Sequence, residues 1–437
     1  MPDHPAFNLA AHVLARGQDN PEKIALAVLS LTGAERWSYG RLIAAVRGCG
    51  RWLLDRAEPG DRVLIRLGNT PAYPVLYLGA IAAGLVPVAT SPLLTAPEIA
   101  KMAALVGAKL VVADPDIAVP DGPVCQADLP AWEAAAPCDW HLGDAGREGY
   151  VVFTSGTSGT PLAVRHAHRA ILGRAMMHRG WEGLTAQDRL LHAGAFNWTY
   201  TMGTGLLDPW TLGATALILG PRATPEQLPL LMKRHDATIL AAAPTHFRRL
   251  LRGDLPPLPR LRHALSAGEA LPPALRAEWQ ARTGTDIHEA LGMSEISTFI
   301  SGSPDRPAPP GASGFPQPGR RIAVLDPEGR PLPPGEIGAL AVSTADPGLM
   351  LGYQGHPAPA GRLVRDRRHG ASGLGRRHSL PGPQRRDDEP RRHPRLAARG
   401  GNRAGRPARR HRSGGGRDRR RRRRPLHRLL LCRGGCA

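Results

Sequence analysis

The most informative stretch of the chain is residues 150–164, which read YVVFTSGTSGTPLAV. The aromatic and β-branched residues 150–153 predict a strand, which leads directly into a loop of Thr, Ser and Gly. Glycines there let the backbone approach an anion closely, and successive N–H groups form a concave site for phosphate oxygens. The GxxxxGK[ST] pattern of the common P-loop is absent. A flexible Ser/Gly linker is the alternative interpretation, but linkers rarely follow a buried strand directly.

Two later segments carry related signals: residues 266–271 read SAGEAL, and residues 289–297 read EALGMSEIS. With the loop, and in this order and spacing, they resemble the adenylate-forming superfamily of acyl-CoA synthetases, adenylation domains of peptide synthetases, and luciferases. The resemblance runs from about residue 7 to about residue 361. Within the superfamily, the chain looks most like the benzoate and short-chain acyl-CoA ligases.

Strands and helices alternate through the body of the chain. One helix is predicted at 72–83. A second is predicted to start at Thr95, where Glu98 completes a capping box, and a third after Thr224, where Gln227 completes another. Strands are predicted at 62–67, 86–90, 109–113, 215–219 and 237–243. This pattern predicts an α/β fold with largely parallel sheets, whose ligands lie at the carboxyl ends of strands.

The resemblance implies that residues 1–360 form a large domain of the adenylate-forming type. It would contain two α/β subdomains plus a small β-barrel, with roughly residues 310–360 as its closing β unit. Short apolar runs at 321–325 and 337–342 predict strands of that unit. Residues 361–437 are expected to be an Arg-rich tail, disordered or out of frame, so that the small C-terminal domain is missing or scrambled.

The formal net charge of +20 is concentrated in this tail. Residues 361–437 hold 26 Arg, no Lys and five acids, whereas residues 1–360 hold 31 basic and 32 acidic side chains. The body is therefore nearly neutral. A genuine basic tail that contacts nucleic-acid phosphates, most strongly at 419–424, is one interpretation. We favour another, because blocks of like charge are usually solvated and disordered.

The favoured explanation is a single-base frameshift near codon 361. Residues 362–369 (RLVRDRRH) can be encoded by codons that give DWFVTGDM when they are read one base later. This shifted sequence contains the family's TGD motif. Residues 376–395 can give AAIHYLGRNDEMMNPGGIRV and residues 396–406 can give SPLEVETALAA, which resemble the family's GRxD hinge and GGxRxxPxEVE segment. Arg368 then stands where the ribose-binding Asp belongs, and the family's catalytic Lys is absent. We expect the printed chain to bind ATP weakly and to form little acyl-CoA.

The resemblance implies a two-step reaction. A carboxylate attacks the α-phosphate of ATP to give an acyl-adenylate and pyrophosphate, and a thiol, usually that of coenzyme A, then takes the acyl group. The first step requires that phosphates are held and that charge is neutralised. ATP, Mg²⁺ and CoA are the implied cofactors, and a small carboxylic acid and CoA are the implied partners. No membrane or nucleic-acid partner is expected, and the sequence leaves open whether the chain forms a homodimer.

The resemblance also assigns site residues. Thr154 and Glu295 are the catalytic candidates, with Glu295 as the Mg²⁺ ligand because this hard cation prefers carboxylate and phosphate oxygens. The residues assigned to ATP and AMP are Thr154, Ser155, Gly156, Thr157, Ser158 and Gly159 at the phosphates, Gly268, Glu269, Ala270, Glu289, Ala290 and Leu291 at adenine, and Ser294 at the α-phosphate. Taken without its motif, Glu295 would more often be an ordinary exposed acid, and it is the LGMSE context that favours a metal ligand.

The expected acyl pocket consists of Phe196, Asn197, Trp198, Thr199, Tyr200, Gly203, Ala267, Gly292 and Met293. If its aromatic residues line a pocket, they favour a small aromatic or a short-to-medium aliphatic acid. If they do not, they are plain core.

Four positions depart from the family pattern. Leu291 stands where an aromatic residue usually stacks on the base, and Ser294, Leu162 and Ala163 stand where the family usually has Thr, Lys and Gly. The first change lowers the expected nucleotide affinity. The loss of Lys removes a cation near the phosphates, which affects the rate rather than the fold.

Composition bounds the cellular setting. The five cysteines, Cys49, Cys125, Cys138, Cys432 and Cys436, show no CxxC spacing, which is typical of a reducing compartment. The N-terminus MPDHPAFN does not read as a signal peptide, and the apolar run 75–89 is too short to span a bilayer. We expect a cytoplasmic protein.

Three classes of function remain open. The favoured one is a carboxylate–CoA ligase. The second is an adenylation enzyme that loads a carrier-protein thiol. The third is a non-catalytic protein that binds nucleotides, or binds nucleic acid through the basic tail.

Overall fold

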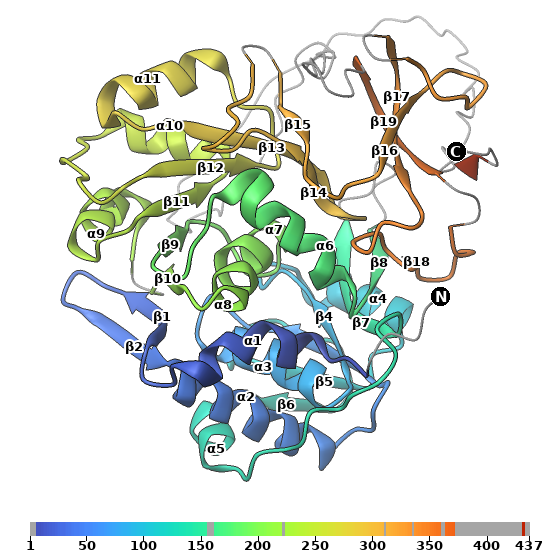
Figure 1. Cartoon of the computed structure of the whole chain (residues 1–437). Helices are drawn as coiled ribbons and strands as arrows, with labels where there is room; N and C mark the ends of the chain where they lie inside the picture. Colours follow the sequence, from blue (N-terminus) through green and yellow to red (C-terminus); the bar gives the residue numbers. More distant parts are fainter. Residues whose placement is uncertain are drawn as a thin grey trace, which may run out of the picture.

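The structure is a computed structural model that describes residues 6–154, 161–220, 223–309, 312–333, 336–359, 363–371 and 431–432. The predicted phosphate loop from Ser155 to Gly159 lies outside the described residues, as does most of the predicted Arg-rich tail. The other predicted site residues are described. Figure 1 shows two large sheets and a smaller one, with helices packed on and between them.

A seven-stranded sheet lies in the lower right of Figure 1, in the order β18-β8-β7-β4-β3-β5-β6. From β7 to β6 the neighbours run parallel, whereas β8 is antiparallel to β7 and β18 is antiparallel to β8. Its strands are β3 (Arg62–Arg66), β4 (Val86–Ala89), β5 (Leu110–Ala113), β6 (Val124–Gln126), β7 (Glu148–Thr154), β8 (Leu162–Ala167) and β18 (Gly352–Tyr353).

Helices cover both faces of this sheet because side chains alternate between the faces along each strand. Val63 and Ile65 pack in the core that includes α3, whereas Leu64 packs in the core that includes α4. Continuous apolar runs in these strands are typical of parallel sheets buried on both sides. The helices of this half are α1 (Leu9–Asp19), α2 (Tyr39–Leu54), α3 (Ala72–Ala82), α4 (Ala96–Val106) and α5 (Leu129–Ala134).

The second sheet has nine strands, in the order β15-β14-β13-β12-β11-β9-β10-β1-β2. The strands from β13 to β1 run parallel, and the two edges are antiparallel. Its strands are β1 (Ile24–Leu29), β2 (Ala34–Ser38), β9 (Arg189–His192), β10 (Thr215–Leu219), β11 (Ile239–Ala242), β12 (His263–Ala267), β13 (Ile287–Met293), β14 (Ser297–Ser301) and β15 (Phe315–Pro316).

Helices α6 to α8 lie in the centre of Figure 1 and belong to both cores. Ile171 and Trp210 pack with the lower helices, whereas Met177 and Trp181 pack with the nine-stranded sheet. The helices are α6 (Ala170–Met177), α7 (Thr199–Met202), α8 (Asp208–Thr211), α9 (Leu228–Arg234), α10 (Pro244–Arg252) and α11 (Pro273–Thr283). Wide π-helical turns, His178–Glu182 and Gly203–Leu207, follow α6 and α7, and a 3₁₀ turn, Pro225–Gln227, precedes α9.

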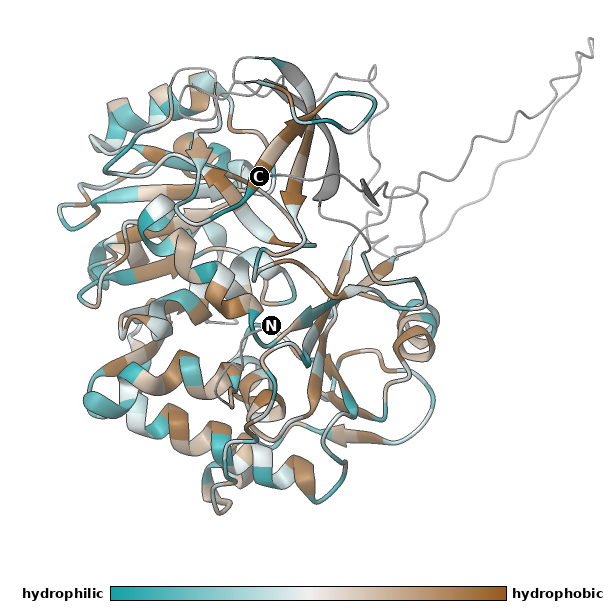
Figure 2. Cartoon of the chain, turned by 45° about the vertical axis from the view of Figure 1, so that its right-hand side comes forward, coloured by the Kyte–Doolittle hydropathy of each residue, from teal (hydrophilic) through white to brown (hydrophobic). Residues whose placement is uncertain are grey.

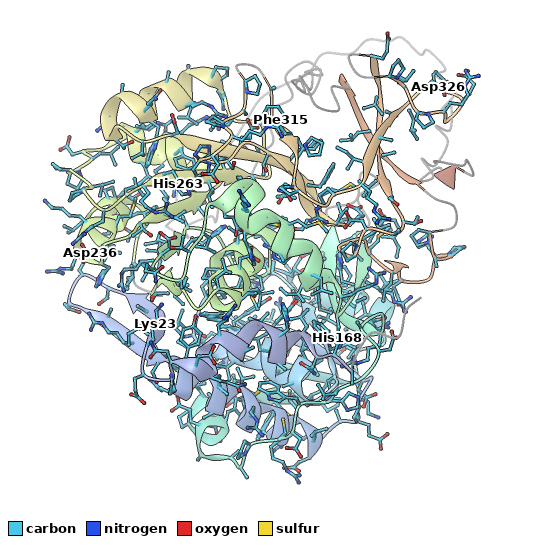
Figure 3. The ribbon with its side chains drawn as sticks, in the orientation of Figure 1. Lys23, His168, Asp236, His263, Phe315 and Asp326 are labelled. Atoms are coloured by element: carbon cyan, nitrogen blue, oxygen red, sulfur yellow. The ribbon has the colours of Figure 1, made fainter. Side chains whose placement is uncertain are left out.

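The small β unit is an open sheet, so the predicted β-barrel is wrong for the described part of the chain. Its order is β16-β17-β19-β20, all antiparallel, from β16 (Ile322–Leu325), β17 (Ile337–Ser343), β19 (Leu363–Ala371) and β20 (Leu431–Cys432). Closing a barrel requires the first and last strands to pair, and β16 and β20 are not neighbours here. The strand β19 extends this sheet beyond residue 360. Figure 3 marks Asp326 in the turn between β16 and β17.

The predicted elements are confirmed with small shifts at their ends. The helix after Thr95 begins with the expected box, because the Glu98 carboxylate accepts hydrogen bonds from the Thr95 N–H at 2.9 Å and hydroxyl at 2.7 Å. Gly107 ends this helix with φ 60°, in the left-handed region. The box at Thr224 starts a 3₁₀ turn before α9, with the Thr224 N–H donating to the Gln227 side chain at 3.1 Å.

Hydropathy follows these layers. In Figure 2 the strands are mostly brown, whereas the outer helices alternate brown and teal. The apolar run 75–89 forms the fully buried helix α3 and the strand β4. Among the described residues, no helix has both the length and the apolar character needed to cross a bilayer.

Candidate active site

Three predicted segments lie at carboxyl ends of strands. Thr154 is the last residue of β7, and it pairs with Leu162 across the hairpin that contains the undescribed loop. The Gly268 segment directly follows β12, and Ser294 directly follows the parallel strand β13. Parallel strands end at the same edge of a sheet, so the Gly268 and Ser294 segments are brought together.

Glu295 is held by a chain segment from far along the sequence. Its carboxylate accepts a hydrogen bond from the Tyr353 hydroxyl at 2.6 Å, and its carbonyl accepts one from the Met350 N–H at 2.8 Å. Tyr353 belongs to β18, where it pairs with Val164 of β8. Because β8 follows the predicted phosphate loop, this pairing brings Glu295 close to the strand on which that loop ends.

The turn around Glu295 carries backbone strain. Ser297 has φ 69°, which is uncommon for a residue other than Gly and costs about 1–3 kcal/mol. Gly292 lies against the returning strand, since a Cβ there would be 2.6 Å from the Ser297 carbonyl oxygen. The tight return of β14 against β13 therefore fixes the loop that carries Ser294 and Glu295.

A neutral histidine holds Ser294. His166 Nε2 donates to the Ser294 carbonyl at 2.8 Å, and the ring stacks on Tyr150 at 4.8 Å. Burial lowers the pKa of His166 to about 4, so the ring is uncharged at neutral pH. The nitrogen Nδ1 then carries no proton, which agrees with the absence of a partner for it among the described residues.

The predicted adenine residues split between surface and core. Gly268, Glu269 and Ala270 are exposed. Glu289 accepts a hydrogen bond from the Leu271 N–H at 3.1 Å, and burial raises its pKa. Ala290 and Leu291 are buried, and Leu291 packs in the core between β13, β14 and the small sheet. Leu291, which stands where the family usually has an aromatic residue, therefore contributes its side chain to the core.

A cavity opens beside Ser294. It encloses about 500 Å³ of space free of protein atoms, part of it open to solvent. Predicted pocket residues that line it are Phe196, Asn197, Trp198, Thr199 and Gly203, and Ser294, the predicted α-phosphate contact, lines it as well. The remaining lining side chains come mainly from α3, β7, β8, α6 and the turn after Glu295, and they include Tyr77, Tyr150, His166, Arg174, Met202 and Ile296.

Four predicted pocket residues do not line this cavity: Tyr200, Ala267, Gly292 and Met293. The Tyr200 hydroxyl donates to the Leu265 carbonyl at 3.0 Å, and the ring meets His192 edge-on at 4.4 Å. Tyr200 therefore fastens α7 to the nine-stranded sheet. Trp198 is 57 % exposed at the rim of the cavity.

Asn69 shapes the same wall, which the sequence did not indicate. Its side chain donates to the Gly194 carbonyl at 2.9 Å and accepts from the Phe196 N–H at 3.0 Å. It therefore holds the segment before α7 across the interface between the two large sheets. A single Asn after a strand carries no signal of such a distant contact.

Arg174 is the second residue that the sequence did not indicate. It is buried, and its guanidinium donates to both oxygens of Asp208 at 2.8 and 2.5 Å, to Thr204 at 3.1 Å and to Ser297 at 2.7 Å. A Cβ at Gly203 would be 2.1 Å from its central carbon. Gly203 is therefore required for close approach of this side chain, at the start of the π-helical turn Gly203–Leu207.

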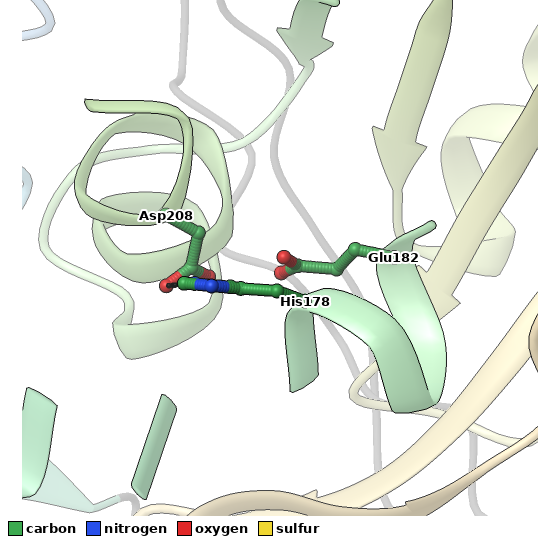
Figure 4. A group of neighbouring side chains, drawn as sticks. All are labelled: His178, Glu182 and Asp208. Carbon is green, nitrogen blue, oxygen red and sulfur yellow. Dashed lines mark ion pairs between the residues drawn. The ribbon is translucent and has the colours of Figure 1, made fainter. Parts of the chain in front are cut away.

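Figure 4 shows His178, Glu182 and Asp208, whose potential ligand atoms lie within 4.8 Å of one another. This cluster does not fit a divalent metal ion. Arg174 already neutralises Asp208, and burial, then the neighbouring Asp208, raises the pKa of Glu182 well above its usual value. Glu182 is fully buried, and its raised pKa disfavours the charged carboxylate that a metal ion needs as a ligand.

Comparisons with known proteins agree with this fold. A family model described as AMP-binding enzyme matches residues 14–354. This family match, together with the two large α/β sheets, defines the class: the chain belongs to the AMP-binding enzyme family of adenylate-forming proteins.

Its relatives include CoA ligases. The benzoate–CoA ligase of Thauera aromatica is 28 % identical over 354 residues, which cover 72 % of this chain and 65 % of the relative. The human mitochondrial acyl-coenzyme A synthetase ACSM2A is 28 % identical over 337 residues, which cover 70 % and 58 %. The chain thus spans less than two thirds of the length of these relatives.

Solved structures show the same fold. An acyl-CoA synthetase from Brucella canis has a TM-score of 0.78 and 25 % identity, and covers 89 % of this chain and 77 % of its own. A benzoate CoA ligase from Burkholderia xenovorans LB400 has a TM-score of 0.75 and 24 % identity, and covers 86 % and 80 %. The predicted fold class and superfamily are confirmed.

Proposed function

We propose that this chain activates a small carboxylic acid with ATP to an acyl-adenylate, and that the acyl group then passes to CoA. One observation carries the proposal: Ser294 lines the cavity and Glu295 follows it directly. The proposed α-phosphate contact and the proposed acyl cavity are thus adjacent, as attack of a carboxylate on that phosphate requires. The CoA ligases among the relatives support the same reaction.

Each group has a proposed role in this reaction. Thr154 and residues 155–159 would hold the β- and γ-phosphates, and Ser294 the α-phosphate. Residues 268–270 and 289–291 would border the adenine, and aromatic side chains such as Phe196 would enclose the acyl group.

Mg²⁺ fits Glu295 as its ligand. The carboxylate is a hard oxygen donor, and the Tyr353 hydroxyl fixes its orientation through the 2.6 Å hydrogen bond. When bound with ATP, Mg²⁺ would neutralise phosphate charge. Tyr353 is a positioning residue, since it would act through Glu295.

Glu295→Gln is expected to lower the rate of ATP–pyrophosphate exchange at least about 100-fold, because a neutral amide is a poor substitute for a charged metal ligand. Tyr353→Phe keeps the carboxylate and loses only its orientation, so about a 10-fold loss is expected. The matched control is Glu278→Gln on the exposed face of α11, which should leave the rate unchanged. Exchange that survives Glu295→Gln would remove Glu295 from the site.

We also propose that residues 1–360 form the adenylation domain and that the codons after residue 361 are read out of frame. The printed chain should show weak exchange and negligible CoA thioester formation. The frame-restored chain should show both exchange and thioester formation with acids such as benzoate or butyrate. Replacing CoA with a carrier-protein thiol tests the second hypothesis, that the enzyme loads a carrier protein. Resequencing across codons 350–375 and the intact mass check the frame. Robust CoA-dependent turnover by the 437-residue chain would contradict the frame proposal.

A further inference from the structure

The walls of the cavity contain one charged side chain among the described residues, Arg174. The other polar lining groups are hydroxyls, an amide and the imidazole of His166, whose pKa of about 4 leaves it neutral. The remainder of the wall is aromatic or aliphatic. Arg174 is therefore the only residue of the described wall with which an anionic group on a bound acid could form an ion pair.

Arg174 is already committed to partners in the protein. Its Nε and Nη2 atoms form the two-pronged pair with Asp208, Nη2 also bonds Thr204, and Nη1 bonds Ser297. An arginine has five N–H donors in a rigid fork, and these contacts occupy four of them. Asp208 is fully buried, so its charge is not screened by water.

The charge state of Glu182 does not give the cluster a net positive charge that would attract an anion. If it is protonated, the Arg174–Asp208–Glu182 cluster is neutral. If it loses its proton, the cluster becomes negative. In both states, a second carboxylate in the cavity meets no net positive charge.

We propose that the cavity accepts carboxylic acids whose acyl group is uncharged and excludes dicarboxylic acids, because Asp208 already neutralises the only charged residue in its described wall. This inference rests on the proposed function, since it specifies the substrate class of the same site. Burying a carboxylate without an available counter-charge costs far more free energy than burying a neutral amide of equal size.

An isosteric pair of inhibitors tests this charge rule. The probes are adenosine 5′-sulfamates N-acylated with succinamoyl or with succinyl, which differ only in a terminal amide or carboxylate. Their dissociation constants are measured by calorimetry at pH 7.5, on the 437-residue chain and on the frame-restored chain. We expect the amide probe to bind at least about 100-fold more tightly.

The double variant Glu182→Gln/Asp208→Asn tests the cause. It leaves Arg174 without either carboxylate, so the preference for the amide probe should fall at least about 10-fold. The single variant Glu182→Gln is the matched control and should keep the preference. If the double variant does not fold, the comparison in the wild-type chain still decides.

The outcomes separate the two proposals. Equal binding of both probes to the wild-type chain would overturn the charge rule and leave the proposed function in place. Binding of neither probe to the frame-restored chain would remove the proposed function and the charge rule together. An unchanged preference in a folded double variant would also overturn the rule, because Asp208 would then not be its cause.

Discussion

Replacing Asp208 with Ala is expected to lower the free energy of unfolding by about 3 kcal/mol. Removing one partner of a buried ion pair leaves the other charge uncompensated, at a cost of about 3–5 kcal/mol, and Asp208 and Arg174 are 0 % and 7 % exposed. The low end applies because the nearby Glu182 also interacts electrostatically with Arg174 and can offset part of its charge. Chemical denaturation at pH 7 measures the change.

A matched control is Asp55→Ala. Asp55 pairs with Arg51 at 2.9 Å, but both side chains are more than half exposed, so less than about 1 kcal/mol should be lost. Adding Arg174→Met to Asp208→Ala should recover much of the loss, since it removes the unpaired charge. If Asp208→Ala costs no more than Asp55→Ala, Arg174 does not depend on Asp208.

Acidification is expected to destabilise the protein steeply below pH 6.5. Burial lowers the pKa of His166 to about 4, and those of His168 and His192 to about 3. Two of these rings accept hydrogen bonds at Nδ1, from the Leu9 N–H at 3.0 Å and the Gly194 N–H at 3.0 Å, which requires an unprotonated nitrogen. Figure 3 marks His168 below α6.

The sign of the effect follows from proton binding. The unfolded histidines gain protons below pH 6.5 while the folded ones do not, so their contribution is complete above pH 6.5 and is lost as pH falls towards 4 and 3. Each histidine contributes about 1.4 kcal/mol per pH unit in this window. Urea unfolding between pH 8 and pH 5 measures the slope.

His168→Asn isolates one histidine. The Asn oxygen can accept from the Leu9 N–H in place of Nδ1, but it does not titrate, so the slope should fall by about 1.4 kcal/mol per pH unit. An equal slope in His168→Asn and the wild-type chain would contradict the assignment.

The fold could be predicted largely from local patterns. Apolar strands such as 62–67 and the capping box at Thr95 depend on residues a few positions apart, and they formed with end shifts of one or two residues. The shape of the small β unit was predicted less well, because closure of a sheet depends on which strands meet in space.

The candidate site could be predicted only in part. A segment with a recognisable motif, such as the one containing Ser294 and Glu295, could be singled out from the sequence, and in the structure it lies beside the cavity. Arg174, Asn69 and Tyr353 were missed because each acts through a partner more than 30 residues away. Tyr200 was assigned to the pocket because it is aromatic, but its hydroxyl bonds the backbone of β12.

The sequence by itself determined the family, the alternation of strands and helices, and the concentration of charge after residue 361. These depend on residue types and short spacings, which the chain carries before it folds. Only the tertiary structure decided which side chains line the cavity and which charges within it are compensated. Burial and pairing of a charge depend on the positions of atoms from distant segments, and Arg174 is paired only because α6 and α8 meet.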